Sequence, residues 1–322
     1  MSALKKLGIN SSKIKANENE NLSEAQKQTQ ESFGFKWHKR DTYNSDAVKS
    51  KAKSWLLERY CDNQPEKLNE WLGDEEKIVL DAGCGAGFSA ELLFGEYLKN
   101  NHYLGVDISD SVYTAAKRFQ EIGYPGDFLQ RDLTDLPIPN ESVDIIFSEG
   151  VLHHTDSTEN SIQYLATKLK TGGRFLFYVY AKKAVIREFT DDYIRERLKN
   201  LSNEEAWQML KPITQLGITL GNLNIEIDVP EDISLLGIPK GKHNLQRFFY
   251  WYICKMFYRP EFSLEEMNHI NFDWFRPLNC HRHTKEEIMK FCHNANLEIE
   301  HLNVQESGIT VVARKANPNI SQ

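Results

Sequence analysis

The chain has 322 residues, 40% of them hydrophobic, which is enough for one sizeable core with an additional lobe. Its formal net charge is -7 and no basic stripe stands out, which disfavours a nucleic-acid partner. No apolar run approaches the roughly 18 residues of a membrane span or forms a signal peptide, and the five scattered cysteines favour a reducing, cytoplasmic location.

The first 75 residues change character near residue 30. Residues 1–30 are rich in Asn, Lys, Glu, Gln and Ser, and we expect most of this arm to be disordered. Residues 31–75 open with four aromatics in FGFKWHKRDTY and continue with apolar residues at a spacing of three to four. This pattern predicts a helical N-terminal cap.

Strands and helices alternate over residues 76–183. The pattern predicts strands at 77–83, 102–109, 126–132, 143–150 and 172–181, and helices at 88–99, 110–123 and 160–169. This order is typical of an α/β fold: a Rossmann-like, doubly wound, mostly parallel seven-stranded sheet with helices on both faces. Residues 283–315 return to the core as a helix and a closing hairpin, so that the last strand is antiparallel.

Residues 184–282 interrupt this rhythm and predict a largely helical insertion. Its aromatic run, residues 248–258, is too short to span a bilayer. Arg247, Lys255 and Arg259 bracket the run, so binding to a membrane surface or homodimerisation is one interpretation. The interpretation that we favour is a lid over a substrate pocket.

A glycine loop at the end of the first strand carries the strongest functional signal. The loop runs from Asp81 through Cys84 to Gly87 and has the spacing G-x-G-x-G at Gly83, Gly85 and Gly87. Such a turn lets a ligand approach the backbone and the amides of the following helix.

The residues around this loop narrow the choice of ligand. Phe88 stands where a dinucleotide-binding loop has its last glycine, and no Gly-Lys-Ser/Thr follows as in a P-loop. Asp81 suits a cationic amino group better than a pyrophosphate. Asp107, at the end of the second strand, can accept both hydroxyls of a ribose. A nicotinamide oxidoreductase is therefore disfavoured.

Four segments in the right order resemble the successive motifs of class I S-adenosylmethionine-dependent methyltransferases. They are VLDAGCGAGFSAELL, YLGVDIS, DLTDLPIPNESVDIIFSEGVLHH and LKTGGRFLFYVY. The resemblance covers about residues 77–181 and implies S-adenosyl-L-methionine as the cofactor.

The resemblance also implies roles for individual residues. Asp81 and the loop glycines would hold the methionine end of the cofactor, and Asp107 its ribose. The adenine would lie against Ile108 and Leu133, with Asp132 receiving its amino group, and Ser148 and Glu149 would line the floor near the sulfonium. The alternative is that these acids only cap helices and form turns.

Two histidines after the fourth strand are the candidate catalytic groups. The strand lacks the Asn/Asp-Pro-Pro-Tyr/Phe signature of the methylases of adenine or glutamine amino groups. It is followed instead by His153 and His154, and histidine is a suitable general base near neutral pH. The alternative is that His153 caps a helix or packs under the loop.

Seven residues are candidates for substrate contact. Tyr178 and Tyr180 alternate along the fifth strand and so share one face of the sheet, although buried tyrosines are common in strands. The stretch from Phe33 to Trp37 resembles an N-terminal element that crosses the cofactor cleft in some methyltransferases; simple packing on the sheet edge is the alternative. Related proteins carry an Asp-Trp and a paired-histidine stretch where this chain has Asp273, His281 and His283.

We expect no metal site, because adjacent Cys and His residues rarely bind one ion and no C-x-x-C or H-x-x-x-H spacing occurs. The favoured function is methyl transfer to an oxygen or nitrogen of a small-molecule metabolite. A non-catalytic S-adenosylmethionine-binding module and an RNA methyltransferase are the alternatives.

Overall fold

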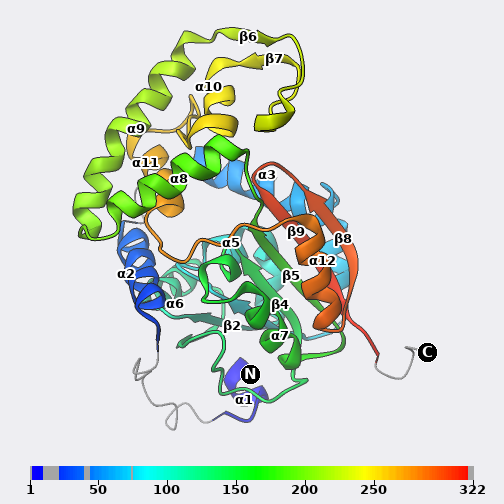
Figure 1. The fold of residues 1–322 in the computed structure, drawn as a ribbon. Coiled ribbons are helices and arrows are strands. Elements are labelled where there is room, and N and C mark those ends of the chain that lie inside the picture. Colours follow the sequence, from blue (N-terminus) through cyan, green and yellow to red (C-terminus); the bar gives the residue numbers. More distant parts are fainter. Residues whose placement is uncertain (1, 10–21, 40–43, 74, 318–322) are drawn as a thin grey trace.

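The computed structural model describes residues 2–9, 22–39, 44–73 and 75–317 (Figure 1). Seven strands form one sheet in the order β3 (Asp127–Gln130), β2 (His102–Asp107), β1 (Ile78–Ala82), β4 (Val143–Glu149), β5 (Leu169–Tyr180), β9 (Gly308–Lys315) and β8 (Leu297–Val304). The pairs among β1 to β5 are parallel, whereas β9 runs antiparallel to both β5 and β8. The predicted Rossmann-like sheet with an antiparallel last strand is confirmed.

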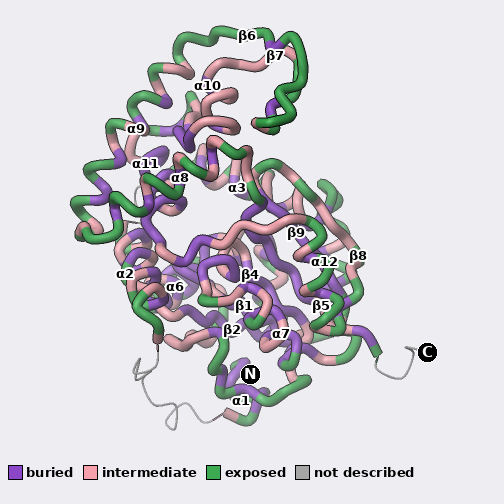
Figure 2. The backbone as a smooth tube through the Cα atoms, viewed as in Figure 1, coloured by how far each residue is buried: buried purple, intermediate pink, exposed green. Residues whose placement is uncertain are grey.

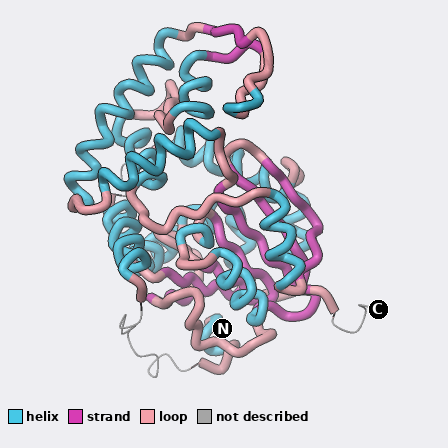
Figure 3. The backbone as a smooth tube through the Cα atoms, viewed as in Figure 1, coloured by secondary structure: helices cyan, strands magenta, loops and turns pink. Residues whose placement is uncertain are grey.

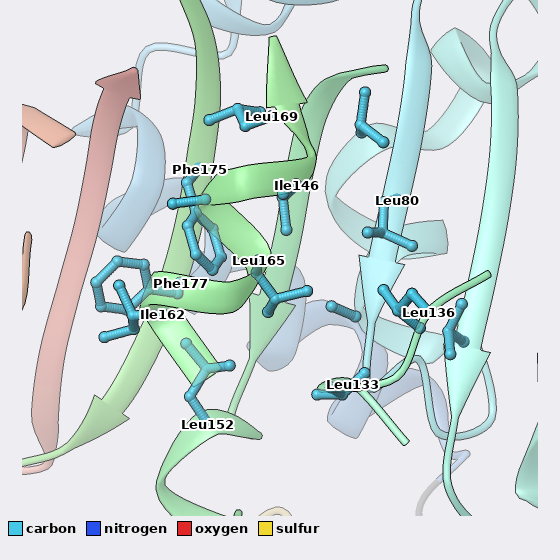
Figure 4. Close-up of a cluster of buried hydrophobic side chains, with 14 of the residues drawn as sticks. Leu80, Leu133, Leu136, Ile146, Leu152, Ile162, Leu165, Leu169, Phe175 and Phe177 are labelled. Carbon is cyan, nitrogen blue, oxygen red and sulfur yellow. The ribbon is translucent and has the colours of Figure 1, made fainter. Parts of the chain in front are cut away.

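Side chains of alternate residues in the central strands point to opposite faces of the sheet, because a strand has a period of two, and they pack into two separate hydrophobic cores. On one face, α1 (Ala3–Lys6), α7 (Thr158–Lys168) and α12 (Lys285–Asn294) cover the sheet. Figure 4 shows Ile162 and Leu165 packing toward Phe175 and Ile146 on this face. On the other face lie α3 (Asp46–Cys61), α4 (Glu66–Leu72), α5 (Phe88–Phe94) and α6 (Ser111–Ile122).

Two element boundaries differ from the sequence prediction by three residues or more. The helix expected at 88–99 ends at Phe94, because Gly95 has a φ of 51°, and a 3-10 helix, η3 (Gly95–Asn100), follows. The helix expected at 160–169 ends at Lys168, before the glycines at 172 and 173. Leu169 pairs with Val143, so the strand begins three residues earlier than predicted.

The prediction of a disordered arm at residues 1–30 is wrong for the described part of that arm. Residues Ala3–Lys6 are helical, and α2 (Glu24–His38) begins well before residue 31. The Ser23 side chain caps α2 by accepting a hydrogen bond from the Gln26 amide, and polar residues of α2 are buried against distant loops. The composition of the arm alone did not predict these contacts. Residues 10–21 of the predicted arm lie outside the described residues.

The insertion forms a lobe beyond the carboxyl ends of the parallel strands (Figures 1 and 3). It comprises α8 (Val185–Leu198), α9 (Asn203–Leu223), β6 (Glu226–Val229), η5 (Ser234–Leu236), β7 (Gly241–Asn244), α10 (Leu245–Phe248), η6 (Phe249–Ile253) and α11 (Leu264–Phe275). It is largely helical, with a small antiparallel pair of strands, β6 and β7, that the sequence did not predict.

The burial pattern separates the sheet from the outer part of the lobe. In Figure 2 the central strands are buried, whereas much of α9 and β6 is exposed.

The aromatic run at 248–258 is not one helix: α10 passes into the π-helix η6, and Cys254 is extended. Among the described residues, no helix is both long and apolar enough to cross a membrane.

Candidate functional site

A cavity of about 520 Å³ lies beyond the carboxyl ends of β1, β2, β4 and β5. Ligands of open parallel sheets bind at this edge, and the volume falls within the range of about 300–1,000 Å³ that is usual for small-molecule sites. The cavity is lined mainly by three parts of the chain, which are the N-terminal helices α2 and α3, the strand ends, and the insertion; residues 305–307 of the turn between β8 and β9 add to this lining. The cavity is therefore completed by segments far apart in the sequence.

The glycine loop has the tight geometry that its spacing predicts. Gly85 has a φ of 51°, and a Cβ there would lie 2.7 Å from Nε1 of Trp37. Gly83 has a φ of 88°, and a Cβ there would lie 2.3 Å from Val151. Gly87, with a φ of 73°, is the N-cap of α5. Side chains at these positions would be strained and would fill space beside the cavity.

Asp107 lines the cavity and organises the glycine loop. Its Oδ2 accepts a hydrogen bond of 2.8 Å from the Gly85 amide, and its Oδ1 accepts bonds from the Ser109 amide and hydroxyl. Burial raises the pKa of Asp107, against the opposing effect of these donors. Each carboxylate oxygen offers two acceptor sites, so Oδ1 is fully used by Ser109 and one site on Oδ2 remains for a ribose hydroxyl.

The adenine side of the predicted cofactor site is present in the cavity wall. Ile108, Asp132 and Leu133 line the cavity beside Asp107. The Asp132 side chain accepts hydrogen bonds from the amide and hydroxyl of Thr134, which fixes its position at the turn after β3. These residues fit an adenosine group, and their contacts to it stay predictions.

Several predicted cofactor residues lie behind the cavity wall. Asp81 is buried and accepts a hydrogen bond of 2.6 Å from the Tyr103 hydroxyl; burial raises its pKa to about 7. Ser148 donates to the Ala82 carbonyl, and Cys84 is buried against α6. The structure gives these three side chains a part in shaping the loop, and a direct contact to the methionine end stays a prediction.

Glu149 lines the cavity, and two side chains of α3 bind its carboxylate. The sequence did not predict this contact. Its Oε1 lies 2.9 Å from Nη1 of Arg59, and its Oε2 accepts a hydrogen bond of 2.6 Å from Tyr60. The Arg59 guanidinium also lies 4.5 Å from the ring centre of Tyr178. Glu149 is therefore a fixed anion at the end of β4.

The two candidate catalytic histidines differ in access. His154 lines the cavity, and its Nδ1 is 2.6 Å from the Asn279 carbonyl oxygen, so Nδ1 carries the proton and Nε2 is a free base. Burial lowers the pKa of His154 to about 4. His153 is fully buried behind the wall, with its ring 3.8 Å from that of Tyr180. His154 therefore lies at the cavity wall and His153 packs behind it, and the role of either histidine as a general base stays a prediction.

The buried His154 predicts a pH dependence of stability. Its pKa is about 4 in the folded chain and about 6.5 when unfolded, so below pH 6.5 the unfolded state binds more protons. This difference lowers the free energy of unfolding as the pH falls from 6.5 to 4. Asp81 has a raised pKa and contributes the opposite slope, so the comparison needs a variant.

Urea unfolding of the wild type and of His154→Gln at pH 7.5 and pH 5 isolates this contribution. We expect the wild type to lose more stability between the two pH values than the variant does. Equal losses would contradict the assignment of a neutral, buried His154.

The predicted substrate residues from β5 and the insertion converge. Tyr178 and Tyr180 share one face and both line the cavity. The Tyr180 hydroxyl donates to Oδ2 of Asp273, and Nζ of Lys36 lies 2.5 Å from Oδ1 of the same carboxylate. Although burial alone would raise the pKa of Asp273, Lys36 and its other cationic neighbours lower it. Asp273 thus joins α2, β5 and α11 at the cavity wall.

The arm helix forms a second wall of the cavity. Phe33 and Trp37 line it, with Phe33 edge-on to His154 at 4.9 Å and Trp37 against Gly85. Nζ of Lys36 lies 4.2 Å from the Trp37 ring centre. α2 therefore lines the cavity and is not packed only on a sheet edge, and its predicted crossing over a bound cofactor stays a prediction.

His281 and His283 are not among the residues that line the cavity, contrary to the sequence expectation. The chain here runs beside the end of β5: the His283 amide donates to the Tyr180 carbonyl, and the Lys182 amide donates to the His283 carbonyl. The ring of His281 lies 3.0 Å from the Thr155 carbonyl, and that of His283 lies 2.9 Å from the Thr158 hydroxyl. Their residue type suggested chemistry, whereas their backbone extends the sheet and their rings are turned toward the loop before α7.

Sequence reasoning did not assign several basic or aromatic residues that line the cavity, among them Trp55, Arg59, Arg247 and Arg259. Trp55 and Arg59 are four residues apart on α3, so helical spacing alone places them on one face. Arg247 and Arg259 flank the aromatic run, where a surface role was one interpretation.

In the described ranges, no group of three or more metal-ligating side chains occurs.

Comparisons with known proteins agree with this architecture. The methyltransferase domain family matches residues 80–177. A tRNA U34 carboxymethyltransferase of Shewanella pealeana is 36% identical over 103 residues, which cover 31% of this chain and 30% of that protein. The uncharacterized methyltransferase YcgJ of Bacillus subtilis is 32% identical over 163 residues, 48% of this chain and 63% of that protein. The chain thus spans less than two thirds of the length of either relative.

Among solved structures, magnesium protoporphyrin IX methyltransferase of Synechocystis PCC 6803 with bound S-adenosylmethionine aligns over 92% of this chain and 99% of that one. The identity is 13% and the TM-score 0.49. The strand order, the glycine loop and the matched family define a methyltransferase domain. Residues 80–177 therefore form a methyltransferase domain, and its sheet and glycine loop are of the class I S-adenosylmethionine-dependent type that the sequence motifs predicted.

Proposed function

We propose that this protein transfers the methyl group of S-adenosylmethionine to an oxygen or nitrogen of a small-molecule metabolite. The observation that carries the proposal is the cavity of about 520 Å³, in which the predicted cofactor residues Asp107 and Asp132 share a wall with Tyr180 and His154. Such a concave site between three chain segments suits a small acceptor.

The residues of the cavity fit the cofactor and divide into two groups. Asp107, Ile108, Asp132 and Leu133 would hold the adenosine, and the backbone of the glycine loop would hold the methionine end. When bound, S-adenosylmethionine supplies an electrophilic methyl group. The residues on the β4 and β5 side align the acceptor in line with that group, and α2 with α11 excludes water.

Removing the proton of the acceptor is the proposed task of His154. Its Nε2 is a neutral base throughout the physiological pH range, because the pKa is about 4. The Asn279 carbonyl fixes the tautomer by accepting from Nδ1. A base of this pKa takes the proton as the bond to the methyl group forms, when the acceptor becomes strongly acidic.

Titration calorimetry with S-adenosylhomocysteine and, separately, with NAD tests the proposed cofactor. Binding of S-adenosylhomocysteine alone is the expected result. Binding of NAD alone would overturn the proposal, and no heat from either would favour a protein that keeps the fold without the activity.

The variant His154→Gln tests the acceptor side. We expect it to keep the dissociation constant of S-adenosylhomocysteine while slowing methyl transfer by about 10²-fold or more, the usual contribution of a general base. His293→Gln, an exposed histidine on α12, is the matched control. Unchanged turnover in His154→Gln would place the base elsewhere.

Methylation of RNA is the second candidate, favoured by the similarity to proteins named tRNA U34 carboxymethyltransferases. The net charge of -7 weighs against it. Filter binding of tRNA across a salt series separates the candidates, since phosphate contacts give an affinity that falls steeply with salt. Tight, salt-dependent binding would favour RNA.

A further inference from the structure

Four Lys and Arg side chains and five acids line the cavity, but only two of the four cations form ion pairs with these acids among the described contacts. Lys36 forms an ion pair with Asp273, and Arg59 forms one with Glu149. Arg247 and Arg259 also line the cavity, and both come from the insertion. In the part of the chain that the structure describes, neither of these two arginines has a carboxylate partner within 4.0 Å.

The contacts of the two arginines leave hydrogen-bond donors available. Arg247 uses Nη2 to donate to the Tyr258 carbonyl at 3.2 Å, and its guanidinium lies 5.4 Å from the Tyr250 ring centre. The guanidinium of Arg259 lies 5.8 Å from the ring of Trp55, and its Nε is buried with no hydrogen-bond partner among the described residues. A buried donor without a partner costs about 1–3 kcal/mol.

Burial and the neighbouring Arg259 both act on the Arg247 guanidinium. Burial lowers the pKa of Arg247, and the nearby Arg259 lowers it further. The exposed Glu261 acts in the opposite direction but forms no ion pair with either arginine among the described contacts. Two partly desolvated cations at close range are unfavourable without an anion. An arrangement of this kind in a cleft marks a binding site.

We propose that the methyl acceptor carries an oxyanion, a carboxylate or a phosphate, which Arg247 and Arg259 bind at the insertion end of the cavity. Guanidinium groups match the geometry of such oxyanions through paired N–H donors. The neighbouring rings of Trp55, Tyr250 and Trp251 line the same cavity and accommodate an apolar or aromatic body. This inference rests on the proposed methyl-transfer function and narrows its substrate class.

Three small probes test the inference on the full chain saturated with S-adenosylhomocysteine. They are benzoate, phenyl phosphate and neutral benzyl alcohol, which share a ring and differ in charge. Titration at constant ionic strength can be followed by tryptophan fluorescence, because Trp55 and Trp251 line the cavity. We expect at least one anion to bind tenfold or more tightly than the alcohol, and the better anion identifies the preferred group.

Variants of the two arginines test whether these side chains cause the preference for anions. Arg247→Gln and Arg259→Gln should each reduce the anion preference at least fivefold, and Arg259→Lys, which keeps the charge, should retain part of it. Arg197→Gln, an exposed arginine of α8, changes the net charge equally and should leave the preference intact. Equal affinity of the wild type for charged and neutral probes, or no binding of either anion, overturns the inference.

The outcome is separate from that of the proposed function. Binding of S-adenosylhomocysteine without an anion preference rejects the oxyanion and leaves methyl transfer standing. Failure of S-adenosylhomocysteine to bind rejects the proposed function itself.

Discussion

We expect Asp107→Ala to weaken S-adenosylhomocysteine binding by more than tenfold, which corresponds to about 1.4 kcal/mol or more. Two losses combine in this variant. The predicted acceptor of the ribose hydroxyls disappears, and the Gly85 amide loses its 2.8 Å hydrogen bond to Oδ2. Hydrogen bonds to a charged group contribute about 1.5–3 kcal/mol each. Titration calorimetry of the purified variant measures the change directly.

Two further variants separate these losses. Asp107→Asn keeps the shape and one acceptor oxygen, so we expect an intermediate affinity. Asp110→Ala removes a half-exposed acid three residues along the chain and serves as the matched control. A dissociation constant in Asp107→Ala equal to that of the wild type would contradict the ribose assignment.

We expect Asp191→Ala to destabilise the protein by about 3–5 kcal/mol, the usual cost of leaving one charge of a buried pair alone. Asp191 and Arg187 are each only 1% exposed, and Nε of Arg187 lies 2.6 Å from Oδ2 of Asp191. The same carboxylate accepts hydrogen bonds from Nε1 of Trp274 and from the Lys255 amide. Urea unfolding, followed by tryptophan fluorescence, gives the change in the free energy of unfolding.

The neighbouring Asp192 provides the control for this prediction. Its side chain is 54% exposed and pairs with Arg195 and Arg282. Asp192→Ala should therefore cost less than about 1 kcal/mol, as exposed ion pairs do. A loss of similar size in both variants would show that burial does not set the energy of the Arg187–Asp191 pair.

The sheet and the glycine loop could be predicted because their signals are local. The alternation of strands and helices, the spacing of Gly83, Gly85 and Gly87, and the acid at Asp107 all depend on residues within a short stretch of chain. The two tyrosines of β5 follow from the period of two along a strand. These features needed no knowledge of distant partners.

The rest of the site depends on contacts between distant segments. The Asn279 side chain donates to Oε1 of Gln26, 253 positions away, which buries the polar start of a helix predicted to be disordered. His281 and His283 look like ligands or bases in the sequence, but their register beside β5 cannot be read from it. Arg259 enters the cavity only because the chain after the π-helix turns back toward α3.

The hydrogen bonds between α2 and residues 276–279 also bear on when the cavity forms during folding. The bonded residues are separated by 248 to 253 positions, so α2 leaves the ribosome long before the segment that it binds. Contacts of such separation close late, because the entropy of a long loop must be overcome first. The cavity therefore becomes able to bind a ligand only after the sheet has formed. Ligand binding during refolding then shows that residues 276–279 have packed against α2.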